Sequence, residues 1–167
     1  MSYFVVFFQA RFLPDQCAAG ITLSADRITA TKTAANCFNT NVLLTRPPPG
    51  ADGSLVVTWR HGAGVNTMFG WALPDLNPTT DRAFDTHGSF VYTSGGGLYG
   101  LGTKGSTLPG GDIPLGATVS LRYDPARGTM HARVNGGAEH PCFTGLRNDL
   151  VPAVCLYNQN ATCAIVD

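Results

Sequence analysis

Charged side chains are scarce in this 167-residue chain. Asp, Glu, Lys and Arg make up 13% of the residues, and 11 basic side chains balance 11 acidic ones, so the formal net charge is zero. Proteins that bind nucleic acids or anionic membrane surfaces depend on clustered positive charge. The composition therefore predicts a chain with no nucleic-acid partner and no membrane partner.

Long apolar runs are also missing. The most apolar stretch, residues 3–8, is far shorter than the roughly 20 residues that cross a bilayer, and neither a basic segment nor a small-residue cleavage site flanks it. This run predicts a first β-strand rather than a membrane anchor or a secretory signal. We therefore expect an intracellular protein, in the cytoplasm.

The five cysteines lack the C-x-x-C spacing of zinc and redox sites, and their number is odd, as expected in a reducing compartment. They are Cys17, Cys37, Cys142, Cys155 and Cys163. If residues 158–160 form a hairpin loop, Cys155 lies directly across from Cys163. The sequence leaves open whether this pair is a disulfide or two small buried side chains.

Histidines are few and do not have the spacing of metal ligands. The four are His61, His87, His131 and His140. No two of them are separated as paired metal ligands on one helix or strand would be, and His131 is expected on the outward face of a strand. The sequence therefore predicts no metal site and no cofactor.

Two motifs that suggest chemistry do not have the context that the chemistry needs. Residues 100–105 fit G-x-G-x-x-G, but the Leu-Pro-Gly-Gly segment at 108–111 cannot form the helix that would receive a pyrophosphate. Asp85, His87 and Ser89 would share one face of a strand, about 6.6–6.8 Å apart, which is too far for the hydrogen bonds of a catalytic triad. We predict that the chain is not an enzyme.

Helical periodicity is absent, whereas turn residues are abundant. Twenty glycines and 11 prolines separate short apolar stretches, a pattern typical of all-β proteins. Apolar and polar residues alternate over 118–123 and again over 129–134, and residues 124–128 between them supply turn chemistry. This segment predicts a hairpin that faces a core on one side.

Further strands are expected on both sides of this hairpin. Residues 21–24 and 27–31 predict an early hairpin, 55–59 and 68–73 predict more deeply buried strands, and 151–157 with 162–166 predict the last two strands. The proline-rich segment at 46–50 is too short for a linker, so we expect it to lead the chain from one sheet to the other.

Two separate segments carry a resemblance to a known family. Residues 38–47 have a phenylalanine-asparagine start, a hydrophobic strand and an arginine-proline exit, and Gly-Thr-Met-His at 128–131 is followed by Asn135-Gly136 and a Pro-Ala-Val strand at 152–154. Together they resemble the Neuralized homology repeat, a close relative of the SPRY domain. The resemblance spans nearly the whole chain, although residues 75–114 match poorly.

The resemblance implies a single domain over residues 1–167, folded as a bent antiparallel β-sandwich of two sheets. It also implies a module that binds a protein or peptide through loops at one end of the sandwich, without catalysis. Such modules serve in ubiquitin-ligase or scaffold assemblies, so the chain is expected to be part of a larger complex or polypeptide. No RING-like array of cysteine and histidine is present, so any ligase activity would belong to another component.

Seven residues are candidates for partner contact: Arg60, His61, Asp81, Arg82, Phe84, Tyr92 and Tyr99. The first two begin a glycine-rich loop, the next three place a charge pair beside an aromatic ring, and the tyrosines flank a glycine run. Arginine and aromatic side chains dominate protein interfaces. The alternatives are a solvated loop for the first pair and inward packing for Phe84 and the two tyrosines.

Two other functions remain open at this point. A lectin-like carbohydrate-binding module would share the sandwich architecture, but Asp75, Asp81 and Asp85 make a poor calcium cluster. A structural subunit of a large assembly would bury a wider surface than a peptide groove offers.

Overall fold

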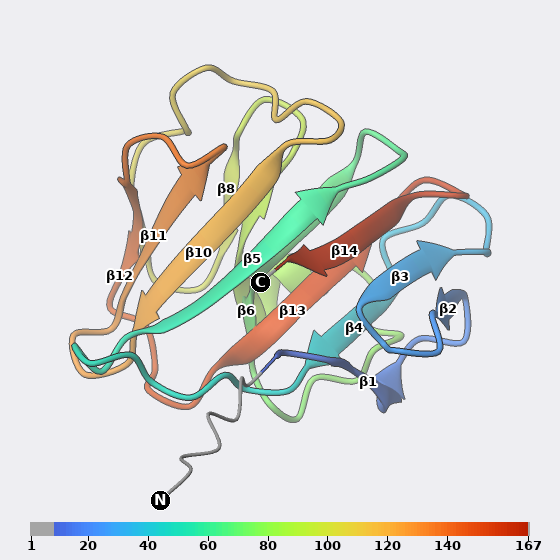
Figure 1. Ribbon diagram of the computed structural model, residues 1–167, viewed down its shortest axis with the longest axis horizontal. Helices are drawn as coiled ribbons and strands as arrows, with labels where there is room; N and C mark the ends of the chain where they lie inside the picture. The colour runs from blue at the N-terminus through green and yellow to red at the C-terminus, as the bar shows by residue number, and fades with distance from the viewer. Residues whose placement is uncertain (1–8, 167) are drawn as a thin grey trace, which may run out of the picture.

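The computed structural model describes residues 9–166, which form two antiparallel sheets packed face to face (Figure 1). The six-stranded sheet contains, in spatial order, β1 (Phe12–Cys17), β4 (Asn41–Leu44), β13 (Val151–Leu156), β6 (Thr67–Ala72), β7 (Gly88–Tyr92) and β8 (Leu98–Gly100). The eight-stranded sheet contains β2 (Ile21–Leu23), β3 (Thr29–Lys32), β14 (Thr162–Val166), β5 (Leu55–His61), β10 (Thr118–Asp124), β11 (Thr129–Val134), β12 (His140–Thr144) and β9 (Thr103–Lys104). The predicted all-β sandwich is confirmed, and the strand expected at residues 3–8 lies outside the described residues.

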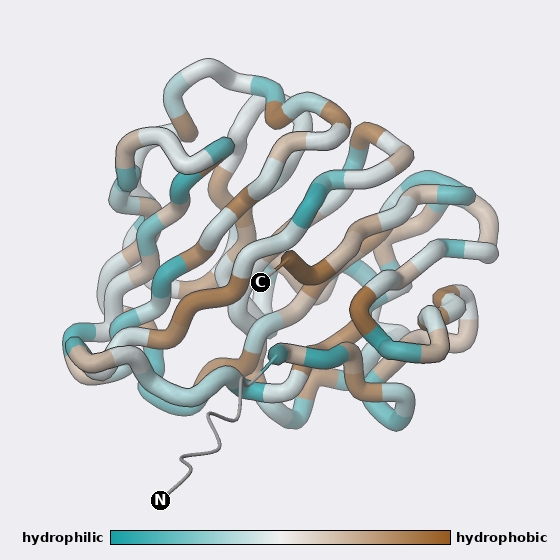
Figure 2. Tube along the Cα trace, in the orientation of Figure 1, coloured by the Kyte–Doolittle hydropathy of each residue, from teal (hydrophilic) through white to brown (hydrophobic). Residues whose placement is uncertain are grey.

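The hairpin of β10 and β11 forms as the alternation predicts. Val119 pairs with Val134 and Asp124 pairs with Thr129, and Figure 2 shows apolar and polar residues alternating along both strands. The Asp124 carboxylate accepts hydrogen bonds from the amides of Ala126 and Arg127, each at 3.0 Å. These bonds close the turn at the point where the sequence supplies an aspartate that can cap its own loop.

Two other strand predictions need correction in detail. The early hairpin exists, but its loop is longer than two residues, because Arg27 adopts a left-handed backbone with φ 59° and Ser24 bonds the Asp26 carboxylate at 2.5 Å. Strand β5 is buried on one face only, since Val56 and Arg60 point to solvent. Strand β6, in contrast, is buried at every position, as predicted.

The outer face of the six-stranded sheet explains the burial of β6. It is covered by the connection between β6 and β7, which contains the short helix α1 (Ala83–Thr86). Leu76, Ala83 and Phe84 of this connection pack on the sheet in an apolar cluster that is separate from the core between the sheets. A second apolar layer on this sheet is the reason that no alternation is visible in β6.

Connections between the sheets agree with one prediction and overturn another. The proline-rich segment leads from β4 in one sheet to β5 in the other, as expected. The last two strands do not form a hairpin, because β13 lies in the six-stranded sheet and β14 in the eight-stranded sheet. Cys155 and Cys163 are therefore in different sheets, and both are free, buried thiols rather than a disulfide.

Aromatic and aliphatic side chains fill the space between the sheets. The rings of Trp59 and Phe69 stack with centroids 5.5 Å apart, and Trp71 meets Tyr123 at 5.0 Å. The Tyr123 hydroxyl donates to the carbonyl oxygen of Arg147. Within residues 9–166, no helix is long and apolar enough to cross a membrane.

Candidate functional site

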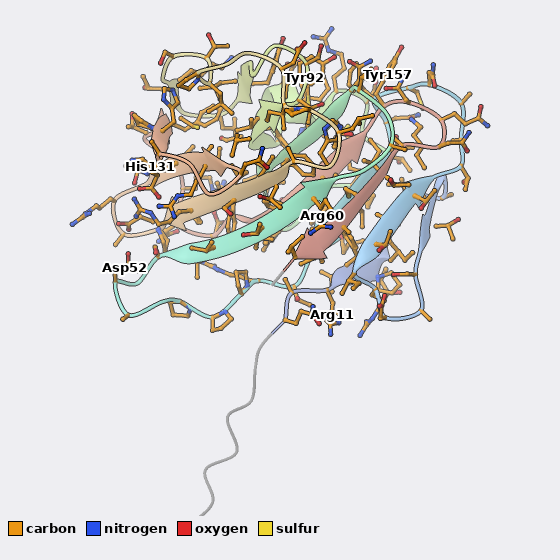
Figure 3. All side chains as sticks on the ribbon, turned by 45° about the horizontal axis from the view of Figure 1, so that its top comes forward. Arg11, Asp52, Arg60, Tyr92, His131 and Tyr157 are labelled. Atoms are coloured by element: carbon orange, nitrogen blue, oxygen red, sulfur yellow. The ribbon has the colours of Figure 1, made fainter. Side chains whose placement is uncertain are left out.

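Five aromatic rings gather at one end of the outer face of the six-stranded sheet. One ring comes from α1, and the other four come from strands β7 and β8 and from the segments before β4 and after β13. We call the five rings the aromatic surface: Phe38, Phe84, Tyr92, Tyr99 and Tyr157. Tyr92 ends β7 beside Met68 of β6, and Tyr157 directly follows β13. Figure 3 shows Tyr92 and Tyr157 at the same end of the molecule. Phe84 is buried with 3% of its surface exposed, while the other four rings are half-buried.

The rings contact one another in a continuous series. Phe38 lies 4.3 Å from Tyr157 and 5.0 Å from Phe84, measured between ring centroids. Tyr99 in turn meets both Phe84 and Tyr92 edge-on at 5.8 Å. Edge-to-face contacts of this kind hold the rings in fixed orientations. The rings therefore support one another in this arrangement within the chain itself.

Asn66 joins the two ends of this series. The Tyr92 hydroxyl donates to the Asn66 side-chain oxygen, and the Tyr157 amide donates to the Asn66 carbonyl at 3.0 Å. Burial raises the pKa of the Tyr92 hydroxyl, and the nearby Tyr99 and Tyr157 hydroxyls raise it further. Tyr92 thus stays protonated at neutral pH and remains a hydrogen-bond donor.

Three cations lie against the rings. The Arg82 guanidinium is 5.7 Å from the centroid of the Phe84 ring. The Lys104 amine is 5.9 Å from the Tyr99 centroid, and the Lys32 amine is 5.9 Å from the Tyr157 centroid. Arg82 reaches this position because it has a left-handed backbone, with φ 50°, just before α1. It also pairs with Asp85 at 2.9 Å. Cations at these distances interact favourably with ring faces.

A pocket of about 400 Å³ lies beside the aromatic surface, on the other side of Asn66, and we call it the loop-end pocket. Its walls come from three loops at the end of the sandwich where β5 ends and β10 begins (Figure 1), and they are formed by His61, Val65, Thr93, Ser94, Asp112, Ile113, Pro114 and Leu115. Val65 and Leu115 are 57% and 58% exposed, which is unusual for aliphatic side chains of this size.

His61 forms the base of this pocket and is not available to a partner. Its ring is 1% exposed, and both ring nitrogens face carbonyl oxygens, with Nε2 at 2.7 Å from Gly64 and Nδ1 at 3.1 Å from Ile113. The prediction that the glycine-rich loop presents His61 outward is therefore wrong. The buried ring instead ties together two of the loops that form the pocket.

The other predicted residues fall into three groups. Tyr92 and Tyr99 belong to the aromatic surface, with Arg82 on its rim, and Asp81 is exposed just before Arg82. Phe84 packs inward, as the alternative interpretation allowed, and it lies in α1. Arg60 is exposed on the opposite sheet, and Figure 3 shows it on β5, away from Tyr92.

Sequence reasoning missed several residues of the two surfaces. Phe38 and Asn66 were not candidates, and neither were Tyr157, Val65 and Leu115. Val65 and Leu115 carried a readable signal, because each is a large aliphatic residue beside a glycine in a loop. Phe38 and Tyr157 carried none, since only the fold brings two residues more than a hundred positions apart into contact.

The side chains of Asp85, His87 and Ser89, which fit the pattern of a triad in the sequence, each contact another residue. Asp85 pairs with Arg82, the Thr86 hydroxyl contacts His87 Nδ1 at 2.7 Å, and the Ser89 hydroxyl donates to the Leu101 carbonyl at 2.8 Å. The residues of the suspected triad therefore have separate partners. In residues 9–166 no cluster of three His, Cys, Asp or Glu side chains is placed to hold a metal ion.

Solved structures with the same fold are SPRY and Neuralized homology domains, which confirms the fold that the sequence resemblance implied. The SPRY domain of human HERC1 superposes with a TM-score of 0.76 at 17% identity, over 93% of this chain and 97% of that one. The PSpry domain of TRIM65 gives 0.68 at 13% identity, over 96% and 93%. The Neuralized NHR1 domain of Drosophila melanogaster gives 0.61 at 11% identity, over 96% and 99%. Neither a family model nor a curated protein matches the sequence.

Proposed function

We propose that this chain is a non-catalytic interaction module that binds a peptide or a protein surface through the aromatic surface and the adjacent loop-end pocket. The observation that carries the proposal is the set of four half-buried rings, already fixed by one another, beside two exposed aliphatic side chains. Preorganised aromatic side chains give large contact area with little loss of rotamer freedom. The zero net charge supports a protein partner rather than a nucleic acid or a membrane.

The wider role that we propose is recognition within a ubiquitin-ligase or scaffold assembly in the cytoplasm. The SPRY-like and Neuralized-like fold supports this role, and five free thiols among the described residues suit a reducing compartment. Within such an assembly the chain would select the partner, while catalysis would come from another component.

Affinity capture with mass spectrometry tests the proposal. The bait proteins are the wild type, a Tyr92→Ala/Tyr99→Ala variant of the aromatic surface, and an Arg60→Ala control on the opposite sheet. We expect a discrete protein partner with the wild type and the control, and its loss with the double variant. A partner that both variants retain would refute the placement of the site. If no protein is captured and a glycan array gives binding, the lectin-like alternative replaces the proposal.

A further inference from the structure

The amine of Lys32 is completely buried behind the aromatic surface, at the end of β3. Its Nζ lies 2.6 Å from the Cys37 carbonyl, 2.7 Å from the Thr40 hydroxyl and 3.0 Å from the Leu156 carbonyl. Three acceptors match the three protons of an ammonium group. Lys32 belongs to none of the ion pairs found among residues 9–166. The oxygen atoms that accept from this amine are therefore all neutral.

A fourth contact of Lys32 is chemically different. The Cys37 sulfur lies 3.2 Å from Nζ, and Cys37 as a residue is half-buried rather than enclosed in the core. A thiol and an amine are therefore within hydrogen-bond distance of each other, and three further acceptors hold the amine in place. Cysteines beside cations are the ones that react with oxidants, because the thiolate is the reactive form.

No amine nitrogen lies within hydrogen-bond distance of the other four cysteine sulfurs in the described part of the chain, although the charge of Lys32 also acts on the Cys155 thiol. Burial raises the pKa of Cys17 to about 11 and the pKa of Cys142, Cys155 and Cys163 to about 12. At neutral pH a thiol with a pKa of about 11 has roughly 100-fold less thiolate than one with the ordinary value. The sulfurs of Cys17, Cys142 and Cys155 contact backbone carbonyls, whereas the Cys37 sulfur contacts both the Ala35 carbonyl at 3.2 Å and the Lys32 amine.

We propose that Lys32 and Cys37 form an oxidation site, at which hydrogen peroxide converts the thiol to a sulfenic acid and the lysine amine then forms a sulfur–nitrogen bond. In the first step sulfur gains one oxygen atom and loses two electrons, while peroxide is reduced to water. In the second step the ammonium group first releases one proton to solvent, and the Nζ lone pair then attacks Sγ while the sulfur–oxygen bond breaks. The leaving hydroxide takes a second proton from Nζ to give water. Condensation of a sulfenic acid with a nitrogen is established chemistry for protein cysteines.

The bond would tie β3 to the segment that carries Phe38, because Cys37 and Phe38 are neighbours. Phe38 and Tyr157 are the two rings of the aromatic surface nearest to this site, and the Cys37 amide already bonds the Tyr157 carbonyl at 3.2 Å. Oxidation therefore acts directly behind the aromatic surface. The chemistry itself does not rest on the proposed function.

Tryptic mapping after peroxide treatment tests the site. Trypsin normally cleaves after Lys32 but not between Arg46 and Pro47, so the unmodified protein gives peptides 28–32 and 33–60. A bond to Nζ blocks cleavage after Lys32, and we expect an uncleaved peptide 28–60 whose mass is lower by two hydrogen atoms. This peptide contains Cys37 as its sole cysteine and has no methionine, so the mass change is specific. Dithiothreitol should restore the two separate peptides.

Variants and rates sharpen the test. The product should be absent in Cys37→Ser and unchanged in Cys17→Ser, which removes a cysteine without a neighbouring amine. In the wild type we expect Cys37 to be lost at least about tenfold faster than Cys17. Because the uncleaved peptide is read in the wild type, the result does not depend on a Lys32 variant that folds.

Four results would overturn the proposal. They are sulfenic or sulfinic acid at Cys37 with normal cleavage after Lys32, a disulfide that joins peptide 33–60 to the peptide containing Cys155, a link that retains the oxygen atom, and equal oxidation rates for Cys17 and Cys37.

Discussion

The outer faces of the two sheets differ in what they expose. On the eight-stranded sheet the outer face carries polar side chains: Arg60 is exposed, the half-buried hydroxyls of Thr58 and Ser120 bond each other at 2.7 Å, and Arg122 pairs with Glu139 at 2.8 Å. On the six-stranded sheet, the outer face is apolar and is covered by the β6–β7 connection, except at the end where the aromatic surface lies. An apolar sheet face has to be covered by the chain itself or by a partner.

The difference shows why the candidate site lies on the six-stranded sheet. The covering connection ends at α1, and the rings beyond it are half-buried rather than enclosed. The outward residues of the eight-stranded sheet are mostly polar, although Val56 is apolar and 48% exposed, and Ala164 and Val166 of β14 also lie on this face. Substitutions on the outer face of the six-stranded sheet should therefore affect stability and binding more than substitutions on the outer face of the eight-stranded sheet.

The largest effect is expected from Phe84→Ala, which removes the buried ring beneath the aromatic surface. Phe84 contacts Phe38 and Tyr99 and is 3% exposed, so the variant leaves a cavity that the neighbouring rings cannot close. We expect the free energy of unfolding to fall by about 3–5 kcal/mol, measured by urea denaturation followed by tryptophan fluorescence. The matched control is Val56→Ala on the outer face of the other sheet, for which we expect a loss below about 1 kcal/mol. Equal losses would mean that the two faces do not differ in stability.

The next effect concerns affinity for a captured partner. Tyr99→Ala should weaken binding at least tenfold, equivalent to about 1.4 kcal/mol, because truncation of an aromatic anchor removes its contact area. Arg60→Ala should change the dissociation constant by less than about threefold, since Arg60 lies on the polar face. Isothermal titration calorimetry with the purified partner measures both. An equal loss of affinity in the two variants would mean that the partner contacts the outer faces of both sheets, which contradicts the difference between them.

A smaller effect is expected when one hydroxyl is removed from the aromatic surface. Tyr92→Phe keeps the ring but loses the hydrogen bond to the Asn66 side chain, whose oxygen is then without that donor. We expect a loss of about 0.5–1.5 kcal/mol in the free energy of unfolding. Thermal and urea denaturation beside the wild type measure it. An unchanged stability would show that water replaces the hydroxyl and that this bond does not shape the surface.

The sequence predicted the eight-stranded sheet better than the six-stranded one. In β10 and β11 one face is buried and the other is polar, so alternation revealed both strands and their turn. In β6 and β13 both faces are buried, so period-2 alternation is absent and only apolar composition marked the strands. The Cys155–Cys163 pairing failed for a related reason, because local turn residues at 158–160 do not tell whether a chain returns in the same sheet.

The sequence predicted residues of the candidate site only where a local feature, such as a run of glycines, lies next to them. Tyr92 and Tyr99 flank a glycine run and were found, whereas both interpretations of His61 placed it in an accessible loop and the burial of Phe84 was only one of two alternatives. Their burial depends on covering segments, the β6–β7 connection and the loop around Ile113, that come from other parts of the chain. Long-range packing of this kind leaves no local pattern in a single sequence.

The smallest effect is expected on the polar face, where it depends on pH. The bidentate bond from Arg122 lowers the pKa of Glu139, and the positive charges of Arg122, His131 and Arg133 lower it further, while burial opposes them. Because the folded pKa lies below the unfolded value of about 4.5, the contribution of Glu139 to stability is full above that value and is lost as the pH falls through the folded pKa. We expect Glu139→Gln to lose up to about 1 kcal/mol at pH 7, as for other surface ion pairs, and the gap to the wild type to close in acid. Urea denaturation of both proteins across this pH range measures the gap. If the difference in unfolding free energy stays constant with pH, the Arg122–Glu139 pair stabilises the protein through packing rather than charge. The outer face of the eight-stranded sheet would then depend on packing, as the outer face of the six-stranded sheet does.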